Sequence, residues 1–110
     1  MTLLNDPIFV EAARKLAERA IHEGGATPRA RLSFIFRLAL GRAANAREMQ
    51  ILQKSLDQML TAYEANEAGA RLLIAVGDAV TDSSISPAEL AAYTAVANII
   101  LNMDEVITKG

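Results

Sequence analysis

The chain has 110 residues, 52% of them apolar, with no cysteine and a formal net charge of −2. This length suits a single domain over residues 1–110 with a buried core, and the apolar content and small net charge exclude wholesale disorder. The lack of cysteine excludes disulfide scaffolds, thiolate zinc sites and cysteine nucleophiles. No apolar run approaches the roughly 18 residues that cross a bilayer, so we expect no membrane insertion and no signal peptide.

Helix start signals divide the chain. Alanine, the best helix former, supplies 21 residues, and small side chains let helices approach closely. A capping side chain precedes a proline three times, in Asp6-Pro7, Thr27-Pro28 and Ser86-Pro87. Glutamate three residues after Asn45 and after Ser86 predicts a capping box at each of these positions. With apolar residues recurring at spacings of three and four, these signals predict helices over residues 7–23, 28–40, 46–65, 66–76 and 87–103.

Stop signals and loops complete the fold prediction. Gly24-Gly25 and Gly41 end the first two helices, and residues 77–85 form a polar loop rich in turn formers. The β-branched residues near the end favour an extended tail over residues 105–110. We therefore expect an all-α fold, a compact bundle of four to five helices with short loops and no sheet.

Residue types that carry catalysis or bind cofactors are sparse in this sequence. The only histidine, His22, has Glu18 as its only nearby candidate ligand, which is too few ligands for zinc. Asp78 and Asp82 lack the spacing of a calcium loop, and no serine stands in a nucleophile-elbow context. We expect no catalytic residue, no metal and no cofactor, and therefore no enzyme activity.

Charge is distributed unevenly along the chain. Residues 1–55 hold nine Lys or Arg against five Asp or Glu, whereas residues 56–110 hold two against eight. A basic face could bind anions or nucleic acid. The other interpretation, which we favour, is that these arginines pair with the acidic second half and with helix ends, which makes nucleic acid an unlikely partner. The candidate anion patch comprises Arg14, Arg19, Arg29, Arg31 and Arg47.

Arginine also suggests structural ion pairs. Arg37 stands between Phe36 and Leu38 in the most apolar predicted helix, so we expect it to be buried and paired. Its candidate partners are Asp104 and Glu105, which would tie the last helix to the second. Arg42 lies near the C-terminal carbonyls of the second helix, where positive charge is favoured.

The last predicted helix has more apolar residues than one core-facing side can use. Ile99, Ile100, Leu101 and Met103 are apolar at nearly successive positions. Surplus apolar surface indicates a partner. Our candidate interaction residues are Ile99, Ile100 and Met103.

Three segments carry a resemblance to a known group of proteins: NDPIFVEAARKLAERAI (Asn5 to Ile21), FRLALGR (Phe36 to Arg42) and AELAAYTAVANIILNMDEVITKG (Ala88 to Gly110). They resemble the C-terminal region of the large planctomycete-type proteins of unknown function associated with cytochrome-c-like domains. Where that group has a proline-threonine-proline helix start after the arginine, this chain has Ala43 to Ala46. The resemblance implies no activity. It gives no functional role to the residues that match its pattern, which include Arg37, Arg42, Asp104 and Glu105.

The resemblance implies a C-terminal domain or free-standing relative that works beside larger secreted domains, so an extracytoplasmic location would follow from such a parent. This chain has no Cys-X-X-Cys-His motif for attaching haem. We expect a non-catalytic helical accessory or interaction domain that docks on neighbouring domains, on a partner chain or on a second copy of itself. The alternative is an anion or nucleic-acid binding module that uses the basic N-terminal half.

Overall fold

Five α-helices and no strand make up the part of the chain that the structure, a computed structural model, describes. It describes residues 7–75 and 85–109, with the side chains of residues 10–75 and 85–103. In chain order the helices are α1 (Pro7–Glu23), α2 (Pro28–Leu40), α3 (Ala46–Ala65), α4 (Glu67–Ile74) and α5 (Pro87–Lys109). The all-α prediction is confirmed, and the first three helices have the predicted bounds.

Local side-chain contacts explain these helix ends. The Thr27 side chain accepts a hydrogen bond from the Ala30 N–H at 3.2 Å, so it caps α2. At α3, Asn45 and Glu48 form the predicted capping box in both directions. Gly41 ends α2 in the left-handed conformation, with φ of 75°, and its N–H bonds to the Arg37 carbonyl. Asp6, the predicted cap of α1, lies outside the described residues.

The last two helices differ from their predicted bounds. The α4 helix covers Glu67–Ile74, because Asn66 serves as its cap and accepts from the Gly69 N–H; predicted residue 76 and most of the predicted loop lie outside the described residues. The α5 helix continues to Lys109, so the prediction of an extended tail was wrong for residues 105–109. Intrinsic strand preference is weak, and continuation of an existing helix overrides it.

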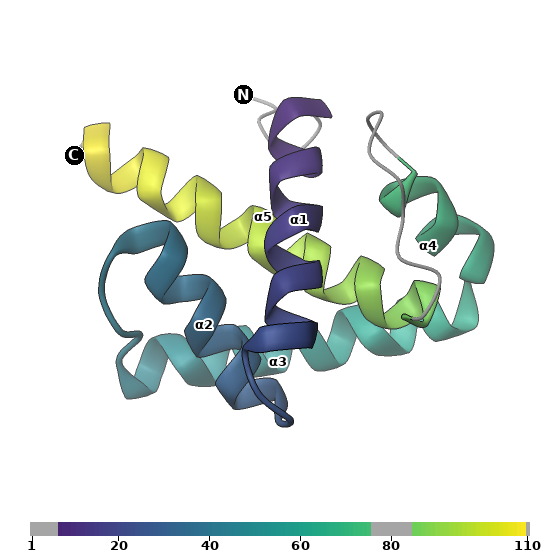
Figure 1. Cartoon of the computed structure of the whole chain (residues 1–110), viewed down its shortest axis with the longest axis horizontal. Coiled ribbons are helices and arrows are strands. Elements are labelled where there is room, and N and C mark those ends of the chain that lie inside the picture. The colour runs from purple at the N-terminus through teal and green to yellow at the C-terminus, as the bar shows by residue number, and fades with distance from the viewer. Residues whose placement is uncertain (1–6, 76–84, 110) are drawn as a thin grey trace.

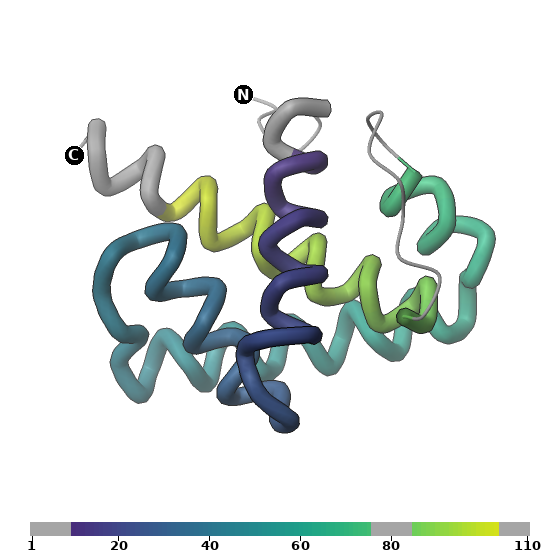
Figure 2. The backbone as a smooth tube through the Cα atoms, in the orientation of Figure 1, coloured from purple at the N-terminus to yellow at the C-terminus, as the bar shows by residue number. Residues whose placement is uncertain are grey.

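The central element is α5, which packs against each of the other four helices. Figure 1 shows α1 crossing α5, with α3 along the opposite side, α2 at one end and α4 at the other. The connections from α1 to α4 are short, as the path in Figure 2 shows: residues 24–27, residues 41–45 and Asn66. The elements therefore pack as a compact bundle around one helix.

Small side chains fill much of the core where these helices meet. In α1 the residues Ala13, Ala17 and Ala20 have no exposed surface, and α5 contributes fully buried alanines as well. Alanine permits close approach of helix axes. Larger side chains complete a single core that draws on every helix; the largest fully buried apolar ones are Tyr93, Phe36, Leu32, Ile35, Leu56, Leu90 and Ile100.

Candidate functional site

Arg14 is fully buried rather than part of a basic surface. Its Nη1 donates a hydrogen bond of 2.7 Å to the Ile74 carbonyl at the end of α4, and its Nη2 lies 4.0 Å from a Glu11 carboxylate oxygen. The predicted place of Arg14 in an anion patch was therefore wrong. The guanidinium instead links α1 to the C-terminal end of α4, where carbonyl groups accept from cations.

Arg31 on α2 is held by partners from α5 and from the turn before α2. Its Nε donates to the Gly25 carbonyl at 3.0 Å, and its Nη1 lies 3.3 Å from Glu89 Oε2 on α5. The guanidinium also lies 5.7 Å from the centre of the Tyr93 ring, and burial raises the pKa of the Tyr93 phenol. Glu89, predicted to complete a capping box with Ser86, thus forms an ion pair that joins α5 to α2.

The remaining members of the proposed patch do not form one cluster. Arg19 pairs with Glu23 at 3.5 Å and lies 5.7 Å from the centre of the Phe34 ring. Arg29 and Arg47 are exposed at the starts of different helices, α2 and α3. Most of the N-terminal basic charge is therefore balanced within the protein or dispersed. The pairing that we expected with the acidic second half is seen for Arg31 with Glu89, whereas Arg19 pairs with a glutamate of the first half.

Arg42 forms an ion pair through two hydrogen bonds with Glu48, the capping glutamate of α3. Its Nη1 and Nη2 donate to the two Glu48 carboxylate oxygens at 2.9 and 2.8 Å, and the guanidinium stacks 4.9 Å from the centre of the Phe36 ring. The hydrogen bonds from Arg42 and from the Asn45 backbone lower the pKa of Glu48 to about 2, and the same pair raises the pKa of Arg42. Arg42 therefore has a structural ion-pairing role, with Glu48 as its partner.

Arg37 does not occupy the buried position that we predicted. Its side chain is exposed, because it lies on the solvent side of α2 while Phe36 takes the core side. Its candidate partners Asp104 and Glu105 fall in α5, but their side chains lie outside the described residues. The prediction that Arg37 is buried was therefore wrong, so Arg37 does not make the buried link to the end of α5 that we expected.

The predicted apolar strip on α5 is divided between core and surface. Ile100 is fully buried, so its assignment to an exposed interaction strip was wrong. Leu101 and Met103 are half-buried and pack against the core cluster. Ile99 faces a different environment, a surface pocket.

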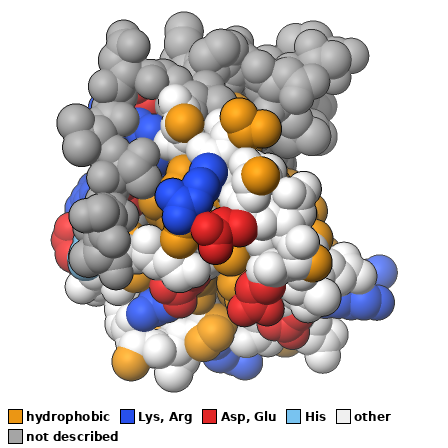
Figure 3. Space-filling view, turned by 90° about the vertical axis from the view of Figure 1, so that its right-hand side faces the viewer, with side chains coloured by type: hydrophobic (Ala, Val, Ile, Leu, Met, Phe, Trp, Pro, Cys, Tyr) orange, Lys and Arg blue, Asp and Glu red, His pale blue; other side chains and the backbone are white. Residues whose placement is uncertain are grey.

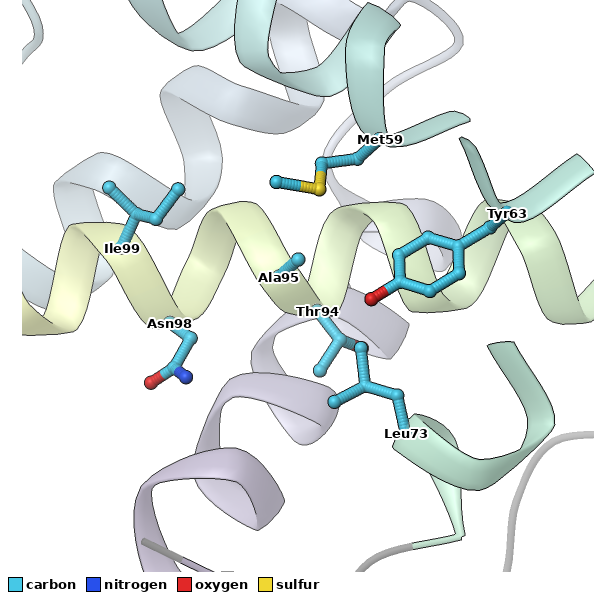
Figure 4. A pocket seen from close by; sticks show the side chains of 7 residues that line it. All are labelled: Met59, Tyr63, Leu73, Thr94, Ala95, Asn98 and Ile99. Atoms are coloured by element: carbon cyan, nitrogen blue, oxygen red, sulfur yellow. The ribbon is translucent and has the colours of Figure 1, made fainter. Parts of the chain in front are cut away.

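This pocket lies between α3, α4 and α5 and has a volume of about 200 Å³. Figure 4 shows Tyr63 reaching from α3 over α5, with its hydroxyl toward Thr94 and Ala95, and Leu73 approaching Thr94 from α4. All of its lining side chains are uncharged, and most of them are apolar. They are Met59, Tyr63, Leu73, Thr94, Ala95, Asn98 and Ile99.

Two lining residues on α5 are polar and buried. Thr94 has no exposed surface, and its hydroxyl has no hydrogen-bond partner among the described residues. Asn98 is 6% exposed, and Asn102 donates a hydrogen bond of 2.8 Å to the Asn98 carbonyl. Sequence reasoning missed the pocket. The available signal was a pair of polar residues, Thr94 and Asn98, spaced four apart in an apolar helix.

Apolar side chains elsewhere on the surface do not gather into one broad patch on the face that Figure 3 shows, where they are dispersed among charged ones. Large apolar side chains exposed in the described part of the chain are Leu38 on α2, Ile51 on α3 and Leu72 on α4. The pocket is therefore a more defined candidate site than the α5 strip that we predicted.

The described residues contain no group of three or more His, Cys, Asp or Glu placed to hold a metal ion. His22 is exposed in the last turn of α1. Asp78 and Asp82 lie outside the described residues. No helix among the described residues has both the length and the apolar character needed to span a membrane.

Comparison with known proteins identifies a family. No curated protein and no solved structure matches the chain. A family model described as "PSD1: Protein of unknown function (DUF1553)" matches residues 1–56, which include α1, α2 and the first half of α3. This match covers two of the three segments on which we based the resemblance, including the FRLALGR motif with Arg42, but not the segment from Ala88. The chain belongs to the PSD1 (DUF1553) family of proteins of unknown function.

Proposed function

We propose that this chain is a non-catalytic helical interaction domain that docks on another protein domain through the α3–α4–α5 pocket. The observation that carries the proposal is the pocket itself, a defined hollow of about 200 Å³ open to the surface and lined mostly by apolar side chains. Concave, mostly apolar sites with a few polar groups are the usual form of a ligand-binding pocket. Interaction energy in docking concentrates where an anchoring side chain fills such a pocket.

The charge arrangement favours docking over the alternative of an anion or nucleic-acid binding module. Binding to a phosphate backbone needs several cationic groups that release counterions together. Here the guanidinium groups of Arg14, Arg31 and Arg42 are engaged within the protein. Their positive charge supports contacts between helices rather than a basic face.

The docking partner that we propose is a neighbouring domain of the same parent protein or a protein encoded beside it. This part of the proposal rests on the resemblance to planctomycete-type proteins associated with cytochrome-c-like domains. In that arrangement the chain would hold larger extracytoplasmic domains together, and any haem would be bound by those domains.

The direct test measures association between this chain and the domain encoded next to it. We expect isothermal titration calorimetry to detect binding and Ile99→Asn, which places an amide at the pocket, to weaken it at least tenfold. Leu38→Asn is the matched control, because Leu38 is exposed on α2, outside the pocket. Circular dichroism of both variants verifies that the helices are retained.

Two results would overturn the proposal. One is an absence of association with the adjacent domain at the highest soluble concentrations. The other is equal weakening by Ile99→Asn and Leu38→Asn in folded proteins, which would separate docking from the pocket.

A further inference from the structure

The α3–α4–α5 pocket combines a ring-sized apolar hollow with a buried hydroxyl that lacks a hydrogen-bond partner among the described residues. We infer that this pocket receives a tyrosine side chain carried by the docking partner. The inference rests on the proposed docking function and specifies the anchor that the partner inserts.

The volume and the lining favour a single aromatic ring. An apolar cavity of about 150 Å³ in another protein binds benzene, so about 200 Å³ accommodates one six-membered ring with a polar substituent. Met59 supplies a thioether, which contacts aromatic rings favourably, and Leu73 and Ile99 supply branched aliphatic walls. An aromatic anchor also adds contact area at small conformational cost because it has only two rotatable side-chain bonds.

The polar groups favour a hydroxyl on that ring. A phenolic hydroxyl can donate to or accept from Thr94 Oγ1, which is fully buried. Phenylalanine would leave the Thr94 hydroxyl without a partner. A lysine or carboxylate would bring a charge into a pocket whose lining side chains are all neutral, which is unfavourable.

Contact between the ring and the Thr94 hydroxyl requires lining side chains to move, because Thr94 has no exposed surface. Met59 is suited to this movement, since an unbranched thioether has three rotatable bonds and repacks readily. In Figure 4 the Met59 side chain extends from α3 over α5, on the side of the pocket opposite Leu73. Leu73 lies against Thr94 in the same view, so a shift of Leu73 would bring the Thr94 hydroxyl within reach of the ring.

The test uses p-cresol and toluene as probes of the full chain, followed by amide NMR shifts of pocket residues. We expect p-cresol to bind about fivefold more tightly than toluene, the factor that one neutral hydrogen bond provides. Thr94→Val, which keeps the side-chain shape, should abolish this preference while toluene still binds. Thr61→Val is the matched control, since Thr61 is an exposed threonine on α3, and it should leave the preference unchanged.

A second pair of probes distinguishes a partner-borne side chain from a free small molecule. N-acetyl-tyrosine amide should shift the same residues as p-cresol and bind more tightly than N-acetyl-phenylalanine amide. Binding of p-cresol without N-acetyl-tyrosine amide would overturn the partner-borne anchor, because the pocket would then take only a free phenol.

Equal binding of p-cresol and toluene, or no NMR shift at pocket residues, would overturn the inference of a tyrosine anchor. Neither result would decide whether the chain docks on the adjacent domain, which the calorimetry tests separately. If calorimetry detects no docking on the adjacent domain but N-acetyl-tyrosine amide still binds, the proposed function is rejected. The chain would then have a phenol-binding pocket without a protein partner.

Discussion

Arg14 illustrates how the position of a residue on a helix determines the role of its charge. It lies four residues after Val10 and three before Ala17, so it falls on the same buried side of α1 as these residues. The sequence thus contained the spacing that places Arg14 toward the core. The spacing alone did not reveal the buried role, because arginine is mostly exposed in proteins and the acceptor of Arg14, the Ile74 carbonyl, is 60 residues away in the chain.

This placement predicts stability losses of very different size for two arginines of the proposed anion patch. Arg14→Ala should lower the free energy of unfolding by about 3 kcal/mol, because it removes buried packing and a hydrogen bond to the Ile74 carbonyl. Arg29→Ala, at an exposed position, should change it by less than about 0.5 kcal/mol. Urea unfolding followed by circular dichroism measures both, and equal losses would contradict the structural role of Arg14.

At the scale of elements, the junction between α2 and α3 explains the arginine in the FRLALGR segment. Gly41 turns the chain out of α2, which places Arg42 between the Phe36 ring and the carboxylate of Glu48. Glu48 in turn completes the cap of α3 with Asn45. The start of α3 lacks the proline found there in the planctomycete-type proteins that the chain resembles. The contacts among Arg42, Glu48 and Asn45 stabilise it instead.

This network predicts a specific pH dependence. Because Arg42 and the Asn45 N–H lower the pKa of Glu48 to about 2 in the folded protein, Glu48 contributes stability above its unfolded pKa of about 4.5. That contribution is lost as the pH falls from about 4.5 toward about 2. We expect Glu48→Gln, which does not titrate, to lose less stability than the wild type between pH 6 and pH 2, as measured by urea unfolding at each pH.

The exposed Glu64 on the same helix provides a control for this experiment. Glu64→Gln should leave the wild-type pH dependence nearly unchanged. A Glu48→Gln curve parallel to the wild-type curve would show that the ion pair does not contribute to stability across this range.

At the scale of the whole molecule, α5 organises the fold by contacting every other helix. Its alanines and those of α1 leave little space between the helices, so close packing rather than large side chains forms this part of the core. The same helix supplies four of the seven lining residues of the pocket. The core and the proposed docking site therefore both depend on one element.

Close packing predicts that enlarging an interior alanine is harmful. Ala17→Leu should lower the free energy of unfolding by about 1–3 kcal/mol, because leucine does not fit where Ala17 has no exposed surface. Ala62→Leu introduces the same side chain at an exposed position of α3, where both residues favour helix, and should have little effect. Thermal unfolding compares the two, and a neutral Ala17→Leu would contradict the close packing of α1.

The sequence by itself determined where most helices begin and end. Thr27, Asn45 and Gly41 act on backbone groups within a few residues of themselves, so the local sequence is enough to predict their effect. The end of α5 was the largest departure, since the preference of β-branched residues for strands is too weak to end a helix that is already formed.

Only the tertiary structure decided which side chains meet. The burial of Ile100, the carbonyl partner of Arg14 and the pocket between Tyr63, Leu73 and Thr94 each depend on helices that are distant in the chain. Apolar spacing indicates that a helix has an inward side but not which neighbour covers it. The reason is physical: capping and periodicity are local, whereas packing depends on the shapes of all five helices together.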